Sequence, residues 1–222
     1  MSAIPTHIKA IKSTLPESVT LVAVSKFHPA ETVLEAYHAG QRIFGESRVQ
    51  ELCAKQEALP ADIEWHFIGP LQSNKVKYIA PFITLIHSVD SIKLLQEINR
   101  RAQQCGRIID VLLEFHIAVE ESKQGLTWEE CTALLEDETA QNARNIRIRG
   151  IMGMATFTDN EQQIREEFRV LKSYFEALKQ HYFQTADHFD ILSMGMSDDY
   201  SIAIEEGSTM VRIGSKIFGV RM

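Results

Sequence analysis

The chain has 222 residues, of which 45% are hydrophobic and 24% charged, and its formal net charge is -7. An acidic chain without a long run of lysine and arginine is not expected to bind nucleic acid or an anionic membrane surface. It carries three widely spaced cysteines, shows no signal peptide at its start, and has no apolar run near the roughly 20 residues that cross a bilayer, which together indicate a cytoplasmic protein without structural zinc.

Apolar segments alternate with helical patterns along the whole chain. The predicted strands are 21–26, 41–45, 63–69, 82–88, 108–117, 146–154, 188–194 and 209–213. The predicted helices between them are 31–39, 46–59, 74–79, 92–104, 127–140, 159–182 and 198–206. This eightfold alternation is typical of a β/α barrel. The alternative, an open doubly wound sheet, needs a glycine-rich phosphate turn, and neither GxGxxG nor GxxxxGK[ST] is present.

The two ends of the chain predict an unusual barrel seam. Only nine residues follow Ile213, too few for a full eighth helix, whereas a helical stretch at about 6–14 precedes the first strand. We expect this extra N-terminal helix to occupy the place left open at the seam. The predicted fold is therefore an α/β protein with a single (β/α)8 TIM-type barrel domain over residues 1–222.

Lys26 ends the first predicted strand, whose apolar residues on both faces indicate an interior position. Barrels and open α/β sheets place their chemistry at the carboxyl ends of such strands. A lysine at this point can form a Schiff base, clamp a phosphate or serve only as a solubilising charge. From the position alone, all three interpretations stay open.

The turns after the last two strands predict a phosphate site. Ser197 follows strand seven, and Gly214 and Ser215 follow strand eight, which are the loops that hold phosphate in many barrels. Ser197 alone is equally explained as a helix cap, and Gly214 as a simple turn, but the two loops together favour phosphate. Arg212 lies inside the eighth strand, where an unpaired charge costs several kcal/mol. It must therefore pair with a carboxylate or face a ligand.

Five segments match a known family. They are VAVSK at 22–26, FGE at 44–46, WHFIGPLQSNK at 65–75, GMSDD at 195–199 and GSTMVRIG at 207–214. From about residue 20 to the C-terminus, the sequence resembles the pyridoxal phosphate (PLP) homeostasis protein family, most specifically in its uninterrupted eleven-residue block. The resemblance implies a barrel like the N-terminal domain of alanine racemase, without the second domain of the racemase.

The resemblance also implies roles for individual residues. Lys26 would hold PLP as an internal aldimine, and Arg212 would face the pyridine nitrogen, which a neighbouring positive charge keeps unprotonated. The phosphate would be held by residues of the last two loops, Ser197, Gly214 and Ser215. His66 and Met152 match positions around the cofactor, although a core histidine explains His66 equally well. No metal is implied.

Three positions depart from the family pattern. Ser47 and His116 stand where the family usually has asparagine, and Lys216 stands where a small residue or threonine is usual. If those asparagines contact PLP, one side of the pocket is rebuilt here and the affinity for PLP is changed. The lysine, the arginine and the phosphate loops are intact.

Three functions are compatible with a reactive Lys26. The first is a non-catalytic PLP carrier in vitamin B6 and amino-acid homeostasis, which passes the cofactor to apo PLP-dependent enzymes. The second is an amino-acid racemase, which needs a base on each face of the substrate, and in alanine racemase the second base comes from the domain missing here. The third is a Schiff-base aldolase, which has no use for an arginine beside a pyridine nitrogen. We favour the carrier, as a monomer.

Overall fold

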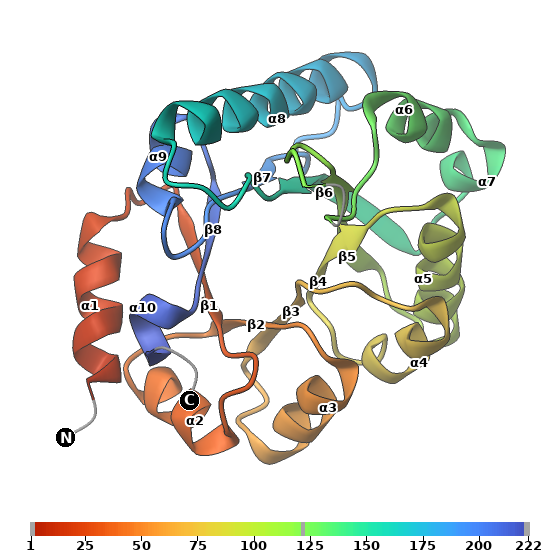
Figure 1. Cartoon of the computed structure of the whole chain (residues 1–222). Helices are drawn as coiled ribbons and strands as arrows, with labels where there is room; N and C mark the ends of the chain where they lie inside the picture. Colours follow the sequence, from red (N-terminus) through yellow and green to blue (C-terminus); the bar gives the residue numbers. More distant parts are fainter. Residues whose placement is uncertain (1–2, 121–122, 220–222) are drawn as a thin grey trace.

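A computed structural model shows a closed parallel barrel surrounded by helices (Figure 1). It describes residues 3–120 and 123–219. The strands are β1 (Thr20–Val24), β2 (Ile43–Glu46), β3 (Glu64–Phe67), β4 (Leu85–Val89), β5 (Ile109–Phe115), β6 (Ile146–Gly153), β7 (Ile191–Ser193) and β8 (Met210–Ile213). Each strand pairs in parallel with the next, and β8 pairs with β1 to close the ring. The predicted eight-stranded barrel is confirmed.

The helices form the outer layer of the barrel (Figure 1). They are α1 (Ile4–Thr14), α2 (Ala30–His38), α3 (Val49–Ala58), α4 (Val76–Ile79), α5 (Ile92–Gln104), α6 (Trp128–Glu136), α7 (Glu138–Gln141), α8 (Glu161–His181), α9 (Tyr200–Glu205) and α10 (Ser215–Phe218), with a 3-10 turn η1 (Ser73–Lys75). A capping box begins α6, because the Thr127 hydroxyl accepts from the amide of Glu130 and the Glu130 carboxylate accepts from the amide of Thr127.

The N-terminal helix lies at the seam between β8 and β1, as predicted. Figure 1 shows α1 beside α10, which follows β8 and is a single turn. Nδ1 of His7 in α1 lies 3.0 Å from the carbonyl oxygen of Ile217 in α10. The side of α1 that faces the molecule buries Ile4, Ile8 and Ile11. This helix therefore covers apolar surface that a full eighth helix would otherwise cover.

Two apolar layers hold the barrel. Most buried residues lie between the strands and the helices, which explains why the strands are apolar on their outer faces. A smaller cluster fills the barrel interior with side chains from five strands, Val22, Leu85, Leu112, Met152 and Met210. The interior is therefore packed rather than open, and the two ends of the barrel are separate environments.

A bulge in β6 depends on Gly150. Val111 pairs with Ile148 and Leu112 with Gly150, so Arg149 is an extra residue in β6. Gly150 has φ of 152°, and a Cβ atom there would lie 1.8 Å from the carbonyl oxygen of Ile191. The backbone of β7 thus approaches β6 at a point where no side chain fits.

We expect Gly150→Ala to destabilise the fold by about 3 kcal/mol, because the methyl group clashes with backbone and the residue must adopt a positive φ. Urea unfolding measures this loss. The matched control is Gly40→Ala, since Gly40 has φ of 86° but nothing within 4 Å of the added Cβ. Equal losses in the two variants would show that β7 moves aside without cost.

Candidate functional site

The carboxyl ends of β1, β7 and β8 surround a cavity of about 240 Å³. Five of the seven predicted site residues line it, namely Lys26, Ser197, Arg212, Gly214 and Ser215. The first of these lies almost 190 positions from the last in the chain, so only barrel closure brings them together. This end of the barrel is where such folds carry their chemistry.

Lys26 lies in the tight turn between β1 and α2. The amide of Ser25 donates to the carbonyl of Gly45 in β2 (3.0 Å), and the amide of His28 donates back to the carbonyl of Ser25 (3.1 Å). Phe27 has a positive φ of 68°, and its amide donates to the Glu51 carboxylate (2.9 Å). A non-glycine residue in this conformation costs about 1 kcal/mol or more, and such residues cluster at functional sites.

A buried ion pair between Lys55 and Glu46 holds the first residue of this turn, Ser25. Nζ of Lys55 in α3 lies 2.6 Å from Oε1 of Glu46 and donates to the carbonyl of Ser25 (2.8 Å). The Ser25 hydroxyl donates to the same Glu46 oxygen (2.6 Å). Burial raises the pKa of Glu46, and the neighbouring Lys55 opposes that shift. The residue directly before Lys26 is thus held by both its carbonyl and its hydroxyl.

Arg212 is 4% exposed and fixed by neutral acceptors. Its guanidinium donates to the carbonyl (2.9 Å) and hydroxyl (2.7 Å) of Ser193 and to the carbonyl of Gly153 (3.0 Å). Within the described part of the chain it forms no ion pair, although the charges of Asp199 and Glu114 act on it. Burial lowers the pKa of Arg212 to about 10 and raises that of Glu114 to about 7. Of the two possibilities left by the sequence, the structure shows Arg212 lining the cavity.

The loops after β7 and β8 contact each other through Ser197. Its Oγ accepts a hydrogen bond from the amide of Gly214 (3.2 Å), so the two loops are joined at the cavity wall. As an acceptor in this bond, the hydroxyl still has its own proton to donate. Ser215 adds a second hydroxyl and, as the first residue of a helical turn, an amide without an intrahelical partner. The loops therefore offer several donors to an anion.

The other two predicted site residues do not line this cavity. His66 is 3% exposed and lines a second pocket at the opposite, amino-terminal end of the barrel. Met152 is 1% exposed and packs in the apolar cluster of the barrel interior. A contact between the cofactor and either residue stays a prediction that the cavity does not support.

The three departures from the family pattern also lie outside the lining of the cavity. Ser47 packs against Gly69, where an added Cβ would lie 2.7 Å from the Ser47 side chain. Nε2 of His116 lies 3.0 Å from the carbonyl oxygen of Glu120, and Nζ of Lys216 lies 4.9 Å from the ring centre of Tyr200. The structure thus gives no sign that these positions rebuild the lining.

Sequence reasoning missed several residues that line the cavity. They are mostly apolar or aromatic: His28, Ile68, Met154, Phe157 and Met196. His28 could have been found, because it lies two residues after Lys26 in the same turn. Its ring centre lies 5.0 Å from that of Phe218 in α10, so the turn after β1 contacts the helix after β8. Phe157, on the loop after β6, carried no comparable signal and is 86% exposed.

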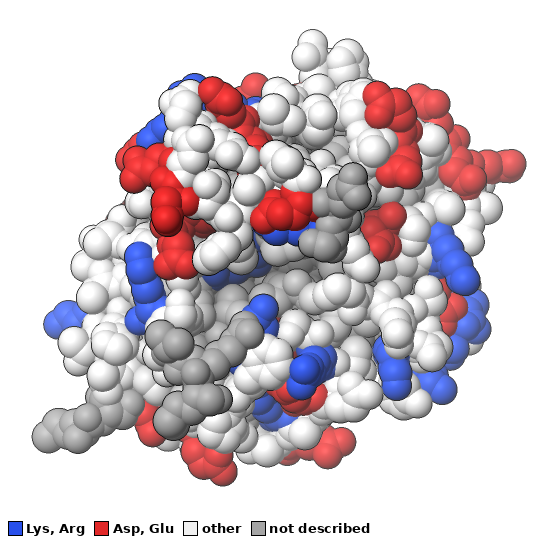
Figure 2. Space-filling view, viewed as in Figure 1, with Lys and Arg blue, Asp and Glu red and all other residues white. Residues whose placement is uncertain are grey.

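The charges around the barrel mouth are unevenly distributed. In the view of Figure 1, Lys and Arg side chains lie beside the central hollow, and acidic side chains gather over α8 and α9 (Figure 2). No group of three or more His, Cys, Asp or Glu residues in ranges 3–120 and 123–219 is arranged to hold a metal ion. In the same ranges, no helix has the length and apolar character that crossing a membrane requires.

Comparison with known proteins shows to which protein family this chain belongs. Residues 1–222 match the alanine racemase N-terminal domain family. The pyridoxal phosphate homeostasis protein of Aquifex aeolicus is 42% identical over 202 residues, which cover 90% of this chain and 86% of that protein. This chain belongs to the pyridoxal phosphate homeostasis protein family.

Two solved structures similar to this chain show the same barrel. Two structures of PipY from Synechococcus elongatus, 37% identical to this chain, superpose with TM-scores of 0.91 without PLP and 0.87 with PLP bound. Each comparison covers 97% of this chain and 100% of PipY. The resemblance noted in the sequence motifs and the racemase-like barrel are both confirmed.

Proposed function

We propose that this protein binds PLP in the cavity at the carboxyl end of the barrel and acts in PLP homeostasis. The observation that carries the proposal is the convergence of an amine, a guanidinium and two donor-rich loops on one cavity, from Lys26, Arg212 and the turns at Ser197 and Gly214. The PLP-bound structure of PipY, a family member of the same fold, supports it.

The groups that line the cavity fit the three functional parts of PLP. The Lys26 amine suits the aldehyde, because its nitrogen can form a C=N bond with the aldehyde carbon while the aldehyde oxygen leaves as water. The hydroxyls of Ser197 and Ser215 and the amide of Ser215 are donors of the kind that hold a phosphate dianion. When bound, PLP supplies an electrophilic aldehyde and an electron-withdrawing ring.

Arg212 would face the pyridine nitrogen. Its burial and its three hydrogen bonds to Ser193 and Gly153 fix the guanidinium in one position, where it forms no ion pair with a carboxylate of the described residues. A fixed positive charge beside a pyridine nitrogen disfavours protonation of that nitrogen. The residue would therefore set the charge state of the bound ring.

We infer that the protein holds PLP without catalytic turnover. Racemisation requires bases on opposite faces of the substrate. Besides Arg212, the titratable residues that line the cavity are Lys26, His28 and Asp198. Because Lys26 and His28 come from one turn and Asp198 follows Ser197, which we assign to the phosphate, we infer that neither His28 nor Asp198 acts as a base opposite Lys26.

The test of PLP binding is a visible absorption spectrum with added PLP, before and after borohydride. We expect wild type to show a Schiff-base band that borohydride removes, and Lys26→Ala to lack it. Lys216→Ala is the matched control, because Lys216 is close to the cavity but outside its lining, and it should keep the band. The absence of a band in wild type would exclude covalent PLP binding, and a reducible band in Lys26→Ala would exclude Lys26 as its site.

The carrier role needs a separate experiment. PLP-loaded protein and free PLP, at equal total cofactor, are mixed with an apo PLP-dependent enzyme, and the recovery of its activity is followed. Direct transfer predicts faster recovery with the loaded protein. Equal rates would contradict transfer while leaving PLP binding intact.

A further inference from the structure

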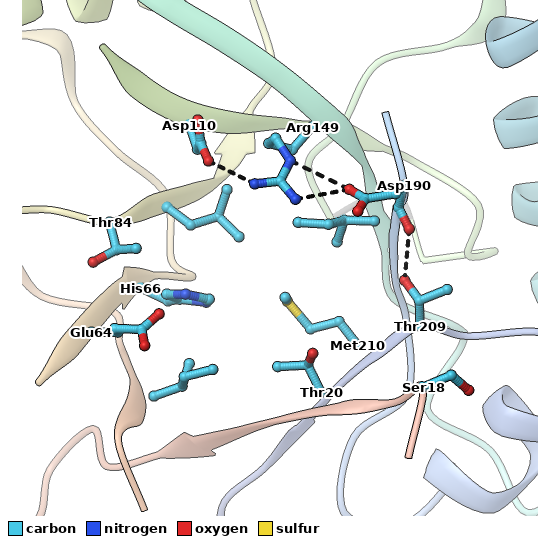
Figure 3. Close-up of a pocket in the computed structure, with 13 residues that line it drawn as sticks. Ser18, Thr20, Glu64, His66, Thr84, Asp110, Arg149, Asp190, Thr209 and Met210 are labelled. Carbon is cyan, nitrogen blue, oxygen red and sulfur yellow. Dashed lines mark hydrogen bonds and ion pairs between the residues drawn. The ribbon is translucent and has the colours of Figure 1, made fainter. Parts of the chain in front are cut away.

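A second pocket, of about 280 Å³, lies at the amino-terminal end of the barrel (Figure 3). Six of its residues are the first residues of their strands, Thr20, Ile43, Glu64, Leu85, Ile191 and Met210. The interior cluster of apolar side chains separates it from the cavity of Lys26. The proposed PLP function makes no use of this pocket.

His66 is the buried polar side chain that faces this pocket. Its ring extends from β3 toward the middle of the pocket (Figure 3), and the residue is 3% exposed. Nδ1 lies 3.0 Å from Nε2 of His87. Nε2 of His66 has no hydrogen-bond partner among residues 3–120 and 123–219, and it is not one of the fully buried polar atoms that lack a partner there, so it is accessible from the pocket.

A chain of hydrogen bonds determines which His66 nitrogen carries the proton. Nδ1 of His87 lies 3.2 Å from the Ser193 hydroxyl, which accepts from Arg212 (2.7 Å). A guanidinium can only donate, and His87 Nδ1 is the other group that the described residues place within hydrogen-bond distance of this hydroxyl, so we assign the Ser193 proton to the bond with His87. Nε2 of His87 then carries a proton and donates to Nδ1 of His66. It follows that Nε2 of His66 is an N–H donor directed into the pocket.

Both histidines are neutral in this arrangement. Burial lowers the pKa of His66 to about 3, against a smaller opposing effect of Asp110, and burial also lowers the pKa of His87 well below its usual range. The donor presented to the pocket is therefore an uncharged imidazole N–H. Its direction follows from the contacts that link Arg212, Ser193, His87 and His66 in the structure.

Four charged side chains line the pocket, Arg149 and three carboxylates, so the lining carries a net negative charge. Arg149 pairs with Asp110 and Asp190, both at 2.9 Å, and Arg147 also pairs with Asp110 (2.7 Å). Glu64, at the exposed rim, is the lining carboxylate without an ion pair within the described part of the chain. An anion would find no unpaired cation here, and a simple cation would leave the His66 N–H without an acceptor.

The other lining groups suit a hydroxylated carbon skeleton. The hydroxyls of Thr20 and Thr84 form no hydrogen bond among the described residues, so each can donate and accept. Apolar side chains lie between these polar groups: Ile43, Leu85, Ile191 and Met210. We propose that this pocket binds a small uncharged polyol, with one hydroxyl oxygen accepting from Nε2–H of His66 and another hydroxyl donating to Glu64.

The first test is made on wild type by NMR of ¹⁵N-labelled protein. We expect both His66 and His87 to show the tautomer with the proton on Nε2. Titration with glycerol, D-ribose or myo-inositol should shift the Nε2 resonance of His66, whereas sodium acetate and ammonium chloride should not. The opposite tautomer, the absence of a shift with every polyol, or a shift with acetate or ammonium would overturn the proposal.

Variants give the second test. His66→Phe should weaken polyol binding about tenfold, the effect of one hydrogen bond to a buried donor. Thr84→Val should weaken it less, and His181→Phe, at an exposed position on α8, should leave it unchanged. If His66→Phe fails to fold, the titration of wild type decides alone. Equal binding by wild type and a folded His66→Phe variant would also overturn the proposal.

Discussion

Lys55→Met is expected to destabilise the protein by about 3–5 kcal/mol at neutral pH, because it leaves the Glu46 carboxylate buried without its cation. Glu46 is 0% exposed, and its second oxygen, Oε2, already has no hydrogen-bond partner among the described residues. Methionine keeps the length of the Lys55 stem, so the loss comes from charge and hydrogen bonding rather than from a cavity. Urea unfolding monitored by circular dichroism measures it.

The pH dependence of this loss has a definite sign. Without Lys55 the folded-state pKa of Glu46 rises further above its unfolded value, so the folded state takes up a proton more readily than the unfolded one. The contribution of Glu46 to the stability of the variant therefore increases as the pH falls, and the gap to wild type narrows in acid. A gap that is constant between about pH 5 and about pH 8 would contradict a buried charge as the cause.

Two further variants test whether the loss of stability comes from breaking the Glu46–Lys55 charge pair or from losing another contact of Lys55. Glu46→Gln together with Lys55→Met removes both charges and should recover most of the lost stability, since replacing a whole buried pair is often nearly neutral. Lys93→Met, on the exposed side of α5, is the matched control and should stay within about 0.5 kcal/mol of wild type. If the double variant is no more stable than Lys55→Met, the contact between Lys55 and the Ser25 carbonyl carries the stability instead.

The fold was predictable because strands buried on both faces leave a strong local pattern. The order of strands and helices is as predicted, and the differences lie at the ends of elements. Strand seven was predicted at 188–194 and is Ile191–Ser193, the helix predicted at 127–140 is divided into α6 and α7, and the one-turn helix α10 was not predicted. The single turn of α10 has too few residues to show a period, so only tertiary packing defines it.

The cavity was predictable where a site residue follows a strand. Lys26 and the loops at Ser197 and Gly214 all come directly after strands, and parallel strands bring their carboxyl ends to one edge whatever their register. His66 and Met152 lie inside strands, where the stagger of the barrel decides which end a side chain reaches. That stagger depends on pairing between distant segments, which a single sequence does not show.

The chain of hydrogen bonds across the barrel could not be predicted either, because it also depends on pairing between distant segments. His66, His87, Ser193 and Arg212 come from β3, β4, β7 and β8, and no spacing in the sequence links them. Arg212 was singled out as a charge that needs a partner. Its partner is the hydroxyl of Ser193, whose own proton is assigned to the bond with His87. Hydrogen bonds therefore connect the cavity at the carboxyl end of the barrel with the pocket at the amino-terminal end.

The hydrogen-bonded histidines His66 and His87 also predict that the free energy of unfolding depends strongly on pH in the acidic range. The folded-state pKa of His66 is lowered to about 3, whereas histidine in an unfolded chain titrates near about 6.5. As the pH falls below that unfolded value, the unfolded state binds a proton that folded His66 refuses, so the free energy of unfolding decreases. Each such histidine contributes up to about 1.4 kcal/mol per pH unit, and His87 has the same sign.

Buried acids oppose this trend, so the total pH profile is not the measurement to use. Burial raises the pKa of Glu114 to about 7, and folded Glu114 therefore takes up a proton before the unfolded chain does, which increases stability as the pH falls. The difference between wild type and His66→Phe isolates one histidine. Between about pH 5 and about pH 6.5, the slope of unfolding free energy against pH should be lower in the variant by about 1 kcal/mol per pH unit.

Urea unfolding of both proteins at several pH values in this range gives the two slopes. His181→Gln is the matched control, because His181 is exposed on α8 and takes no part in the hydrogen bonds that link His66 to Arg212. The slope for this variant should equal the slope for wild type. Equal slopes for wild type and His66→Phe would mean that folded His66 accepts a proton. Its Nε2 would then already face water able to solvate a charge, and the neutral N–H donor inferred for the second pocket would be excluded at the same time.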